Sequence, residues 1–123
     1  MTMTDDTGPA DDGLADARSR AREVRALYEQ LEGRLLGRTW TLPELALGFT
    51  HDAAYVGRLV LAAERTWDID GDTDAELRHK LAECLWWLFV LADRLDVDLS
   101  EAYGATMERI GGGLRRAVAE GAG

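Results

Sequence analysis

The chain has 123 residues and a formal net charge of −9, which suits one domain with a single hydrophobic core. Apolar residues make up 46% of it and charged residues 30%, the balance of a globular protein. The acidic charge argues against nucleic acid and anionic membranes as partners, because both attract basic surfaces. A nucleotide remains open as a ligand, since a metal ion can bridge acidic side chains to phosphate.

Cys84 is the single cysteine, so no disulfide forms within the chain, and a reducing, cytoplasmic location is expected. The first residues have neither a basic segment nor an apolar run, so we interpret residues 1–12 as a disordered acidic leader and not as a signal peptide. The longest apolar run, residues 84–92, is far shorter than the roughly 20 residues that a membrane span needs. We therefore expect no membrane partner.

The first predicted helix covers residues 14–35 and should end at Gly37. Its apolar residues recur at steps of three and four, which places them on one face of a helix. They are Leu14, Ala17, Ala21, Val24, Leu27, Tyr28, Leu31 and Leu35.

The second predicted helix begins at the segment "WTLPEL" and runs to about Arg65. Thr41 and Glu44 have the spacing of a capping box, in which each side chain bonds a free backbone amide at the helix start. Trp40 and Leu45 stand where a hydrophobic staple fixes the entry of the chain.

The third predicted helix opens at Thr73, which has capping-box spacing with Glu76, and ends near Leu95. Apolar residues cover nearly all of its sides. A helix of this kind is either central in its fold or shared with another subunit.

A shorter fourth helix is predicted to follow, with Asp98 as its N-cap and Glu101 at the reciprocal position. The triplet "GGG" at 111–113 is expected to break it and to leave the rest of residues 111–123 as a short tail, either a short helix or a loose segment. The folded domain is then residues 13–110. Four amphipathic helices with short connections predict an all-α four-helix bundle with the third helix central. The surplus apolar surface predicts a homo-oligomer assembled through helical interfaces, either a dimer or a tetramer.

Two acidic residues interrupt apolar surroundings, Asp52 on the second helix and Glu83 on the third. Packing of these helices against each other would bring the carboxylates together, and two facing carboxylates need a cation between them. That cation is either Mg²⁺, which prefers carboxylate oxygens and keeps waters for phosphate, or the ammonium of Lys80, one turn from Glu83.

Three segments resemble the MazG-like family of all-α nucleoside triphosphate pyrophosphohydrolases. They are "WTLPELALGFTHDAAYVGRLVLAAE", "HKLAECLWWLFVLADRLDVDL" and "EAYGATM". The resemblance implies a dimeric or tetrameric helical bundle that cleaves a nucleoside triphosphate to a monophosphate and pyrophosphate. It also implies a Mg²⁺ site made by two pairs of acidic residues, one pair on each of the second and third helices.

The four positions that the resemblance assigns to the metal fall on Asp52, Tyr55, Lys80 and Glu83 in this sequence. Only two of them are acidic, and together they carry a charge of −1 at neutral pH. Because Mg²⁺ resists dehydration and is held by charge, we expect weak Mg²⁺ binding here. We interpret Glu83 as inherited from a metal site and now neutralised by Lys80.

Other residues are weaker candidates. His51, Tyr55 and His79 are candidate catalytic groups, and the i, i+4 spacing of His79 and Glu83 suits an acid–base pair or a transition metal. Lys80, Arg58 and Trp87 are candidate substrate-binding residues, through phosphate contact or base stacking. Cys84 has no adjacent histidine and is interpreted as a small buried apolar residue.

Three functions remain open from the sequence. The favoured one is a MazG-like protein that has lost Mg²⁺-dependent pyrophosphohydrolase activity and serves as a nucleotide- or ligand-binding or regulatory module. The second is an active hydrolase in which Asp52, Glu83 and Glu76 hold the metal. The third is a bundle of this type whose pocket serves another chemistry.

Overall fold

The computed structural model describes residues 11–122 of the chain, and this part consists of four α-helices without a β-strand. The helices are α1 (Asp11–Leu36), α2 (Leu42–Ala63), α3 (Thr73–Arg94) and α4 (Leu99–Ala122). The predicted all-α, four-helix fold is confirmed. Residues 1–10 of the predicted acidic leader lie outside the described residues. No helix of the described part is long and apolar enough to cross a membrane.

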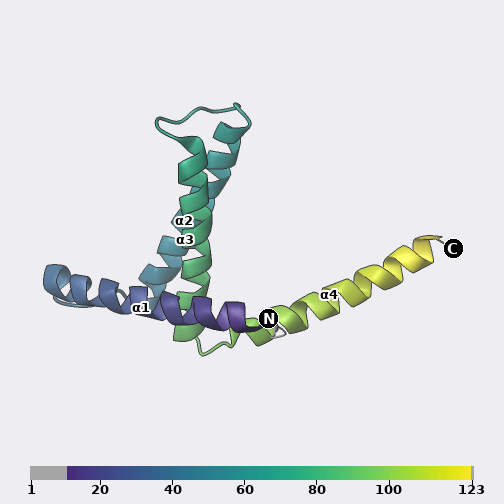
Figure 1. Cartoon of the computed structure of the whole chain (residues 1–123), viewed down its shortest axis with the longest axis horizontal. Helices are drawn as coiled ribbons and strands as arrows, with labels where there is room; N and C mark the ends of the chain where they lie inside the picture. Colours follow the sequence, from purple (N-terminus) through teal and green to yellow (C-terminus); the bar gives the residue numbers. More distant parts are fainter. Residues whose placement is uncertain (1–10, 123) are drawn as a thin grey trace, which may run out of the picture.

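Helices α2 and α3 run side by side in opposite directions and are joined by the loop that closes one end of the pair (Figure 1). Their shared core is built on Leu45, Trp87 and Val90, with Phe49 and Leu91 packed at its edge. α1 crosses the other end of the pair and also packs on α3. The predicted central position of the third helix is therefore confirmed, since α3 contacts both α1 and α2.

The start of α2 forms as its sequence predicts. The backbone amide of Glu44 donates to Thr41 Oγ1 over 3.3 Å, and the backbone amide of Thr41 donates to Glu44 Oε1 over 2.8 Å. These two bonds make a complete capping box. At the other end the helix stops at Ala63, two residues before the predicted end, and Arg65 takes a positive φ of 59°.

The predicted cap of α3 is one residue off. Asp72, and not Thr73, is the N-cap, and its carboxylate accepts from the backbone amide of Ala75 over 3.1 Å. Thr73 is the first helical residue instead. The physical reason is that Asp and Thr both cap helices well, so two adjacent candidates leave the choice to the path of the preceding loop.

The fourth helix begins as predicted, because Asp98 Oδ1 accepts from the backbone amide of Glu101 over 3.1 Å. The predicted break at 111–113 and the separate tail after it are wrong, since α4 continues without interruption to Ala122. Glycine weakens a helix by about 1 kcal/mol per residue relative to alanine but does not forbid helical dihedral angles. α4 points away from the α2–α3 pair and meets α1 only near the corner where both helices begin (Figure 1).

Candidate functional site

The ammonium of Lys80 lies between the two carboxylates that interrupt the apolar faces of α2 and α3. Its Nζ atom is 3.2 Å from Asp52 Oδ1 and 2.9 Å from Glu83 Oε1. The packing of α2 on α3 brings Asp52 to this position, whereas Lys80 and Glu83 are neighbours one turn apart on α3. The predicted lysine bridge between the helices is confirmed.

Asp52 is the one buried charged residue of the described chain, with 8% of its surface exposed. Its second oxygen, Oδ2, accepts a 2.8 Å hydrogen bond from Trp87 Nε1, and Oδ1 also lies 3.2 Å from His51 Nδ1. Burial alone would raise the pKa of Asp52, but the contacts with Trp87, His51 and Lys80 outweigh it and hold the pKa below its ordinary value. Asp52 is therefore a fully engaged, ionised carboxylate.

Lys80 is held in the protonated state by the same contacts. The hydrogen bond to Glu83 raises the pKa of the ammonium, burial opposes this, and the bond to Asp52 adds to it. The aromatic ring of Tyr55 covers another side, with its centroid 5.7 Å from Nζ, within the reach of a cation–π contact. Tyr55 and Lys80, the two non-acidic positions, thus belong to the same cluster as Asp52 and Glu83.

Gly48 makes room for the Trp87 indole and was not identified from the sequence. A Cβ atom at this position would lie 2.5 Å from Trp87 Cη2 and 2.7 Å from Cζ2, well inside van der Waals contact. Gly48 stands one helical turn before Asp52, so the ring passes over the glycine to reach the carboxylate. A glycine at i−4 from a lone buried acid on the same face is the signal in the sequence that points to this arrangement.

An open cavity of about 480 Å³ adjoins the cluster on the side of Trp87. The Trp40 and Trp87 rings line it in a near-parallel arrangement, with centroids 6.4 Å apart and planes inclined by 24°. The other lining residues are Glu44, Leu47, Gly48, His51 and Asp52. The wall is thus aromatic and apolar, with two carboxylates among its lining residues, which suits a flat, uncharged or cationic ring better than an anion.

The two histidines flank the cluster from the solvent side. His79 Nε2 lies 3.3 Å from Glu83 Oε1, which is the predicted i, i+4 contact. The side chains of His51 and His79 are 77% and 64% exposed. Cys84 is partly buried, and burial raises the pKa of its thiol, which disfavours the reactive thiolate.

Arg58, a predicted substrate-binding residue, lies elsewhere. Its guanidinium donates to the backbone carbonyls of Trp67 and Asp68 over 2.7 and 2.8 Å, and it stacks on the Trp67 ring at 4.1 Å from the centroid. Arg58 therefore fastens the loop between α2 and α3, and the structure does not bring it to Lys80.

The donor atoms of the cluster do not fit the Mg²⁺ site that the MazG-like resemblance implies. Such an ion needs several oxygen ligands, whereas this cluster offers two carboxylates, and Lys80 contacts both. Among the described residues no group of three or more His, Cys, Asp and Glu side chains is placed to hold a metal.

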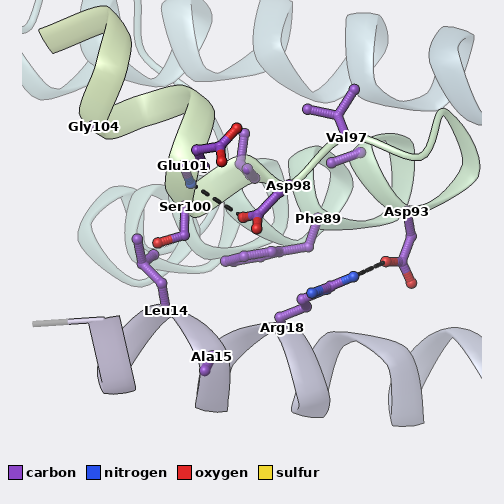
Figure 2. Close-up of a pocket in the computed structure, with 12 residues that line it drawn as sticks. Leu14, Ala15, Arg18, Phe89, Asp93, Val97, Asp98, Ser100, Glu101 and Gly104 are labelled. Carbon is purple, nitrogen blue, oxygen red and sulfur yellow. Dashed lines mark hydrogen bonds and ion pairs between the residues drawn. The ribbon is translucent and has the colours of Figure 1, made fainter. Parts of the chain in front are cut away.

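A second cavity, of about 380 Å³, lies at the corner of α1, α3 and α4 (Figure 2). None of the candidate site residues lines it. Three of its charged lining groups serve the fold: Arg18 binds Asp93 and, together with the neighbouring Arg22, fastens α1 to α3, and Asp98 caps α4. The hydrogen bond from Arg22 keeps the pKa of Asp93 below its ordinary value; burial opposes this, and the charges of Arg22 and Arg18 add to it.

Comparison of the chain with described protein families, with curated proteins and with solved structures finds no match. The MazG-like resemblance therefore stays a hypothesis that rests on the three segments quoted above.

Proposed function

We propose that this chain is a non-hydrolytic ligand-binding module in which a lysine takes the place of a divalent cation. In terms of the resemblance, it is a MazG-like protein without Mg²⁺-dependent nucleoside triphosphate pyrophosphohydrolase activity. The observation that carries the proposal is the contact of one ammonium with both carboxylates, 3.2 Å to Asp52 and 2.9 Å to Glu83.

Three features support the absence of metal-dependent hydrolysis. Lys80 occupies the space between the carboxylates, and its positive charge would repel a divalent ion. At an effective dielectric constant of about 20, unit charges 4 Å apart interact by roughly 4 kcal/mol. Phosphoryl groups in turn need a metal or free cations, whereas the ammonium here is held by its own two carboxylates and is not free to bind them.

The ligand site that this proposal assigns is the cavity beside Trp40 and Trp87. Its aromatic wall supports a flat ring, such as a nucleobase, as the group that enters. The two charged lining residues, Glu44 and Asp52, are carboxylates paired with Arg38 and Lys80, so the lining offers phosphate no free lysine or arginine. The expected ligands are therefore nucleosides or other flat heterocycles, and nucleoside triphosphates should bind no more tightly than the nucleosides.

The deciding experiment compares metal binding by the wild type with that of a Tyr55→Glu, Lys80→Glu double variant, which supplies all four acidic positions. Calorimetric titration with Mg²⁺ and Mn²⁺ is expected to show no binding in the millimolar range to the wild type and measurable binding to the double variant. Arg78→Glu is the control for charge, because Arg78 is exposed and pairs only with Asp74. It should leave the titration unchanged.

Two results would overturn the proposal. Millimolar or tighter Mg²⁺ binding with pyrophosphate release by the wild type would establish the active hydrolase instead. Quenching of tryptophan fluorescence by nucleosides tests the cavity directly. Trp40→Ala is the variant, and Trp67→Ala is the control, because Trp67 is exposed and does not line the cavity. Equal loss of quenching in both variants would exclude the assigned cavity.

A further inference from the structure

The Trp40 ring, one wall of the ligand cavity, lies on the connection between α1 and α2 and belongs to neither helix. α1 ends at Leu36, and the next residue, Gly37, has the left-handed φ of 73° that often turns a chain back after a helix. The backbone amide of Gly37 donates to the carbonyl of Gly33 over 3.1 Å. The connection then returns toward the α2–α3 pair (Figure 1). The position of Trp40 therefore depends on what holds this connection.

Glu32 holds the connection to α1. Its Oε1 atom accepts a 2.8 Å hydrogen bond from the backbone amide of Trp40, which follows it in the chain by eight residues. The Glu32 side chain is only 12% exposed, and a hydrogen bond to a charged acceptor is strong where water is largely excluded. A carboxylate on α1 thus fixes the backbone of the residue whose ring forms the wall.

Arg25 orients Glu32 from two turns earlier on the same helix. Its guanidinium makes a two-pronged contact with the carboxylate, 2.8 Å from Nη1 to Oε2 and 3.1 Å from Nη2 to Oε1. Burial would raise the pKa of Glu32, but the hydrogen bonds from Arg25 and from the Trp40 amide outweigh it and hold the pKa below its ordinary value. Glu32 is therefore an ionised acceptor with both oxygens fixed.

A separate anchor serves the α2 end of the connection. Glu44 on α2 binds the Arg38 guanidinium over 2.8 and 2.9 Å. The same carboxylate accepts from the backbone amide of Thr41 over 2.8 Å. These contacts hold the residues before and after Trp40 to α2, whereas the amide of Trp40 itself is bound to α1. The wall thus has one anchor on each helix.

We propose that Arg25 and Glu32 are positioning residues for the ligand cavity, which hold the Trp40 ring in its near-parallel arrangement with Trp87 through the Trp40 amide. Neither Arg25 nor Glu32 lines the cavity, so they act on the ligand through Trp40. A wall that is already in place binds a ligand more tightly than one that must become ordered on binding. The effect on the ligand rests on the proposed function, whereas the position of Trp40 can be measured without a ligand.

Two variants break the link between α1 and Trp40. Glu32→Gln removes the charge of the acceptor. The double variant Arg25→Met, Glu32→Met removes both buried charges together, so that no unpaired charge remains to unfold the protein, and it leaves the Trp40 amide without its acceptor. Glu29→Gln is the matched control, because Glu29 is 45% exposed and meets the same arginine at 3.8 Å.

Amide hydrogen exchange followed by NMR reports the position of Trp40 without a ligand. The Trp40 amide should exchange faster in both link variants, by about tenfold or more in the double variant, since a hydrogen bond to a charged group is lost. The Thr41 amide, which Glu44 holds on α2, should keep its rate, and Glu29→Gln should change neither amide. Unchanged exchange of the Trp40 amide, or equal acceleration of both amides, would overturn the proposal.

Quenching of tryptophan fluorescence by adenosine measures the consequence for the ligand. The dissociation constant should rise by about fivefold or more in both link variants, because a smaller fraction of the protein has the wall in place. Glu29→Gln should keep the wild-type value. A wild type that adenosine does not quench would refute the assigned ligand, and faster exchange of the Trp40 amide would then still support the hold of Glu32 on Trp40. Faster exchange with an unchanged dissociation constant would show that this hold does not serve the ligand and would overturn the proposal.

Discussion

Trp87 and Asp52 join α3 to α2 through a 2.8 Å hydrogen bond from the indole Nε1 to Oδ2. The carboxylate would otherwise be an isolated charge in an apolar stripe, which is costly. Since Lys80 contacts the other oxygen of Asp52, both oxygens have a donor. The burial of the acid is therefore explained by two partners from α3, one neutral and one charged.

Replacement of Trp87 by phenylalanine should destabilise the protein by about 2 kcal/mol, since a hydrogen bond to a charged group is worth about 1.5–3 kcal/mol and its loss leaves Oδ2 of Asp52 unpaired. Urea denaturation followed by circular dichroism measures the change. Trp67→Phe is the control, because Trp67 is 59% exposed. The unfolding free energy of this variant should stay within about 0.5 kcal/mol of the wild type. Equal losses in the two variants would contradict the assigned role of the indole.

Lys80→Met should also destabilise the fold, by about 2 kcal/mol, because it leaves Asp52 buried without its compensating charge. The value is below the 3–5 kcal/mol of a fully buried pair, since the Lys80 side chain is 20% exposed and water screens part of the interaction. Adding Asp52→Asn to Lys80→Met should recover part of the loss, because the uncompensated charge is removed. A double variant less stable than the sum of the single changes would argue against the pairing.

The matched control for Lys80→Met is Arg78→Met on the same helix. Arg78 pairs with Asp74 over 2.9 Å, but both side chains are more than three-quarters exposed. Exposed pairs of this kind contribute little, so the urea midpoint should hardly move. An equal effect of the two substitutions would mean that the Lys80 bridge contributes no more than a surface ion pair.

Much of the fold follows from the sequence by local rules. The apolar periodicity gives four helices, and the capping residues Thr41 and Asp98 give the starts of two of them. The Lys80 bridge between α2 and α3 could also be predicted from the sequence. A buried acid on one helix and a Lys–Glu pair on its neighbour leave few ways to balance their charges. Lys80 is moreover the only lysine of the chain, so no other ammonium side chain was available.

Local rules fail where several residues compete or where the packing of one helix on another decides. Asp72 and Thr73 are both good caps, and the loop path selects between them. The continuity of α4 through 111–113 runs against local propensity, because glycine triplets disfavour helix. The contact between Gly48 and Trp87 depends on the register of α2 against α3, which a single sequence does not determine.

Gly48→Ala should destabilise the protein by about 1–3 kcal/mol, the usual cost of overpacking, because the added methyl would lie 2.5 Å from Trp87 Cη2. Gly57→Ala on the same helix provides an opposite control. A Cβ at Gly57 meets nothing within 4 Å, so the better helix propensity of alanine should stabilise the fold by up to about 1 kcal/mol. Thermal unfolding of the two variants should therefore shift in opposite directions from the wild type. Equal shifts of the two unfolding temperatures would mean that the Trp87 ring does not pack over Gly48.

The stability of the fold should fall at alkaline pH through Lys80. The pKa of its ammonium is raised in the folded protein, chiefly by the hydrogen bond to Glu83, so the folded state holds this proton more tightly than the unfolded state. The stabilisation is complete below the unfolded pKa of about 10.4. It is lost as pH rises through the higher folded pKa.

Lys80→Arg isolates this contribution, because guanidinium stays charged throughout the range in which lysine titrates. The urea midpoint of the wild type should decline above about pH 10, and that of Lys80→Arg should decline less steeply. Alkaline effects that do not involve residue 80 are common to both proteins and cancel in the comparison. Parallel declines of the two urea midpoints would mean that Lys80 loses its proton equally readily in the folded and unfolded chains. The ammonium bridge would then not be what holds Asp52 and Glu83 together.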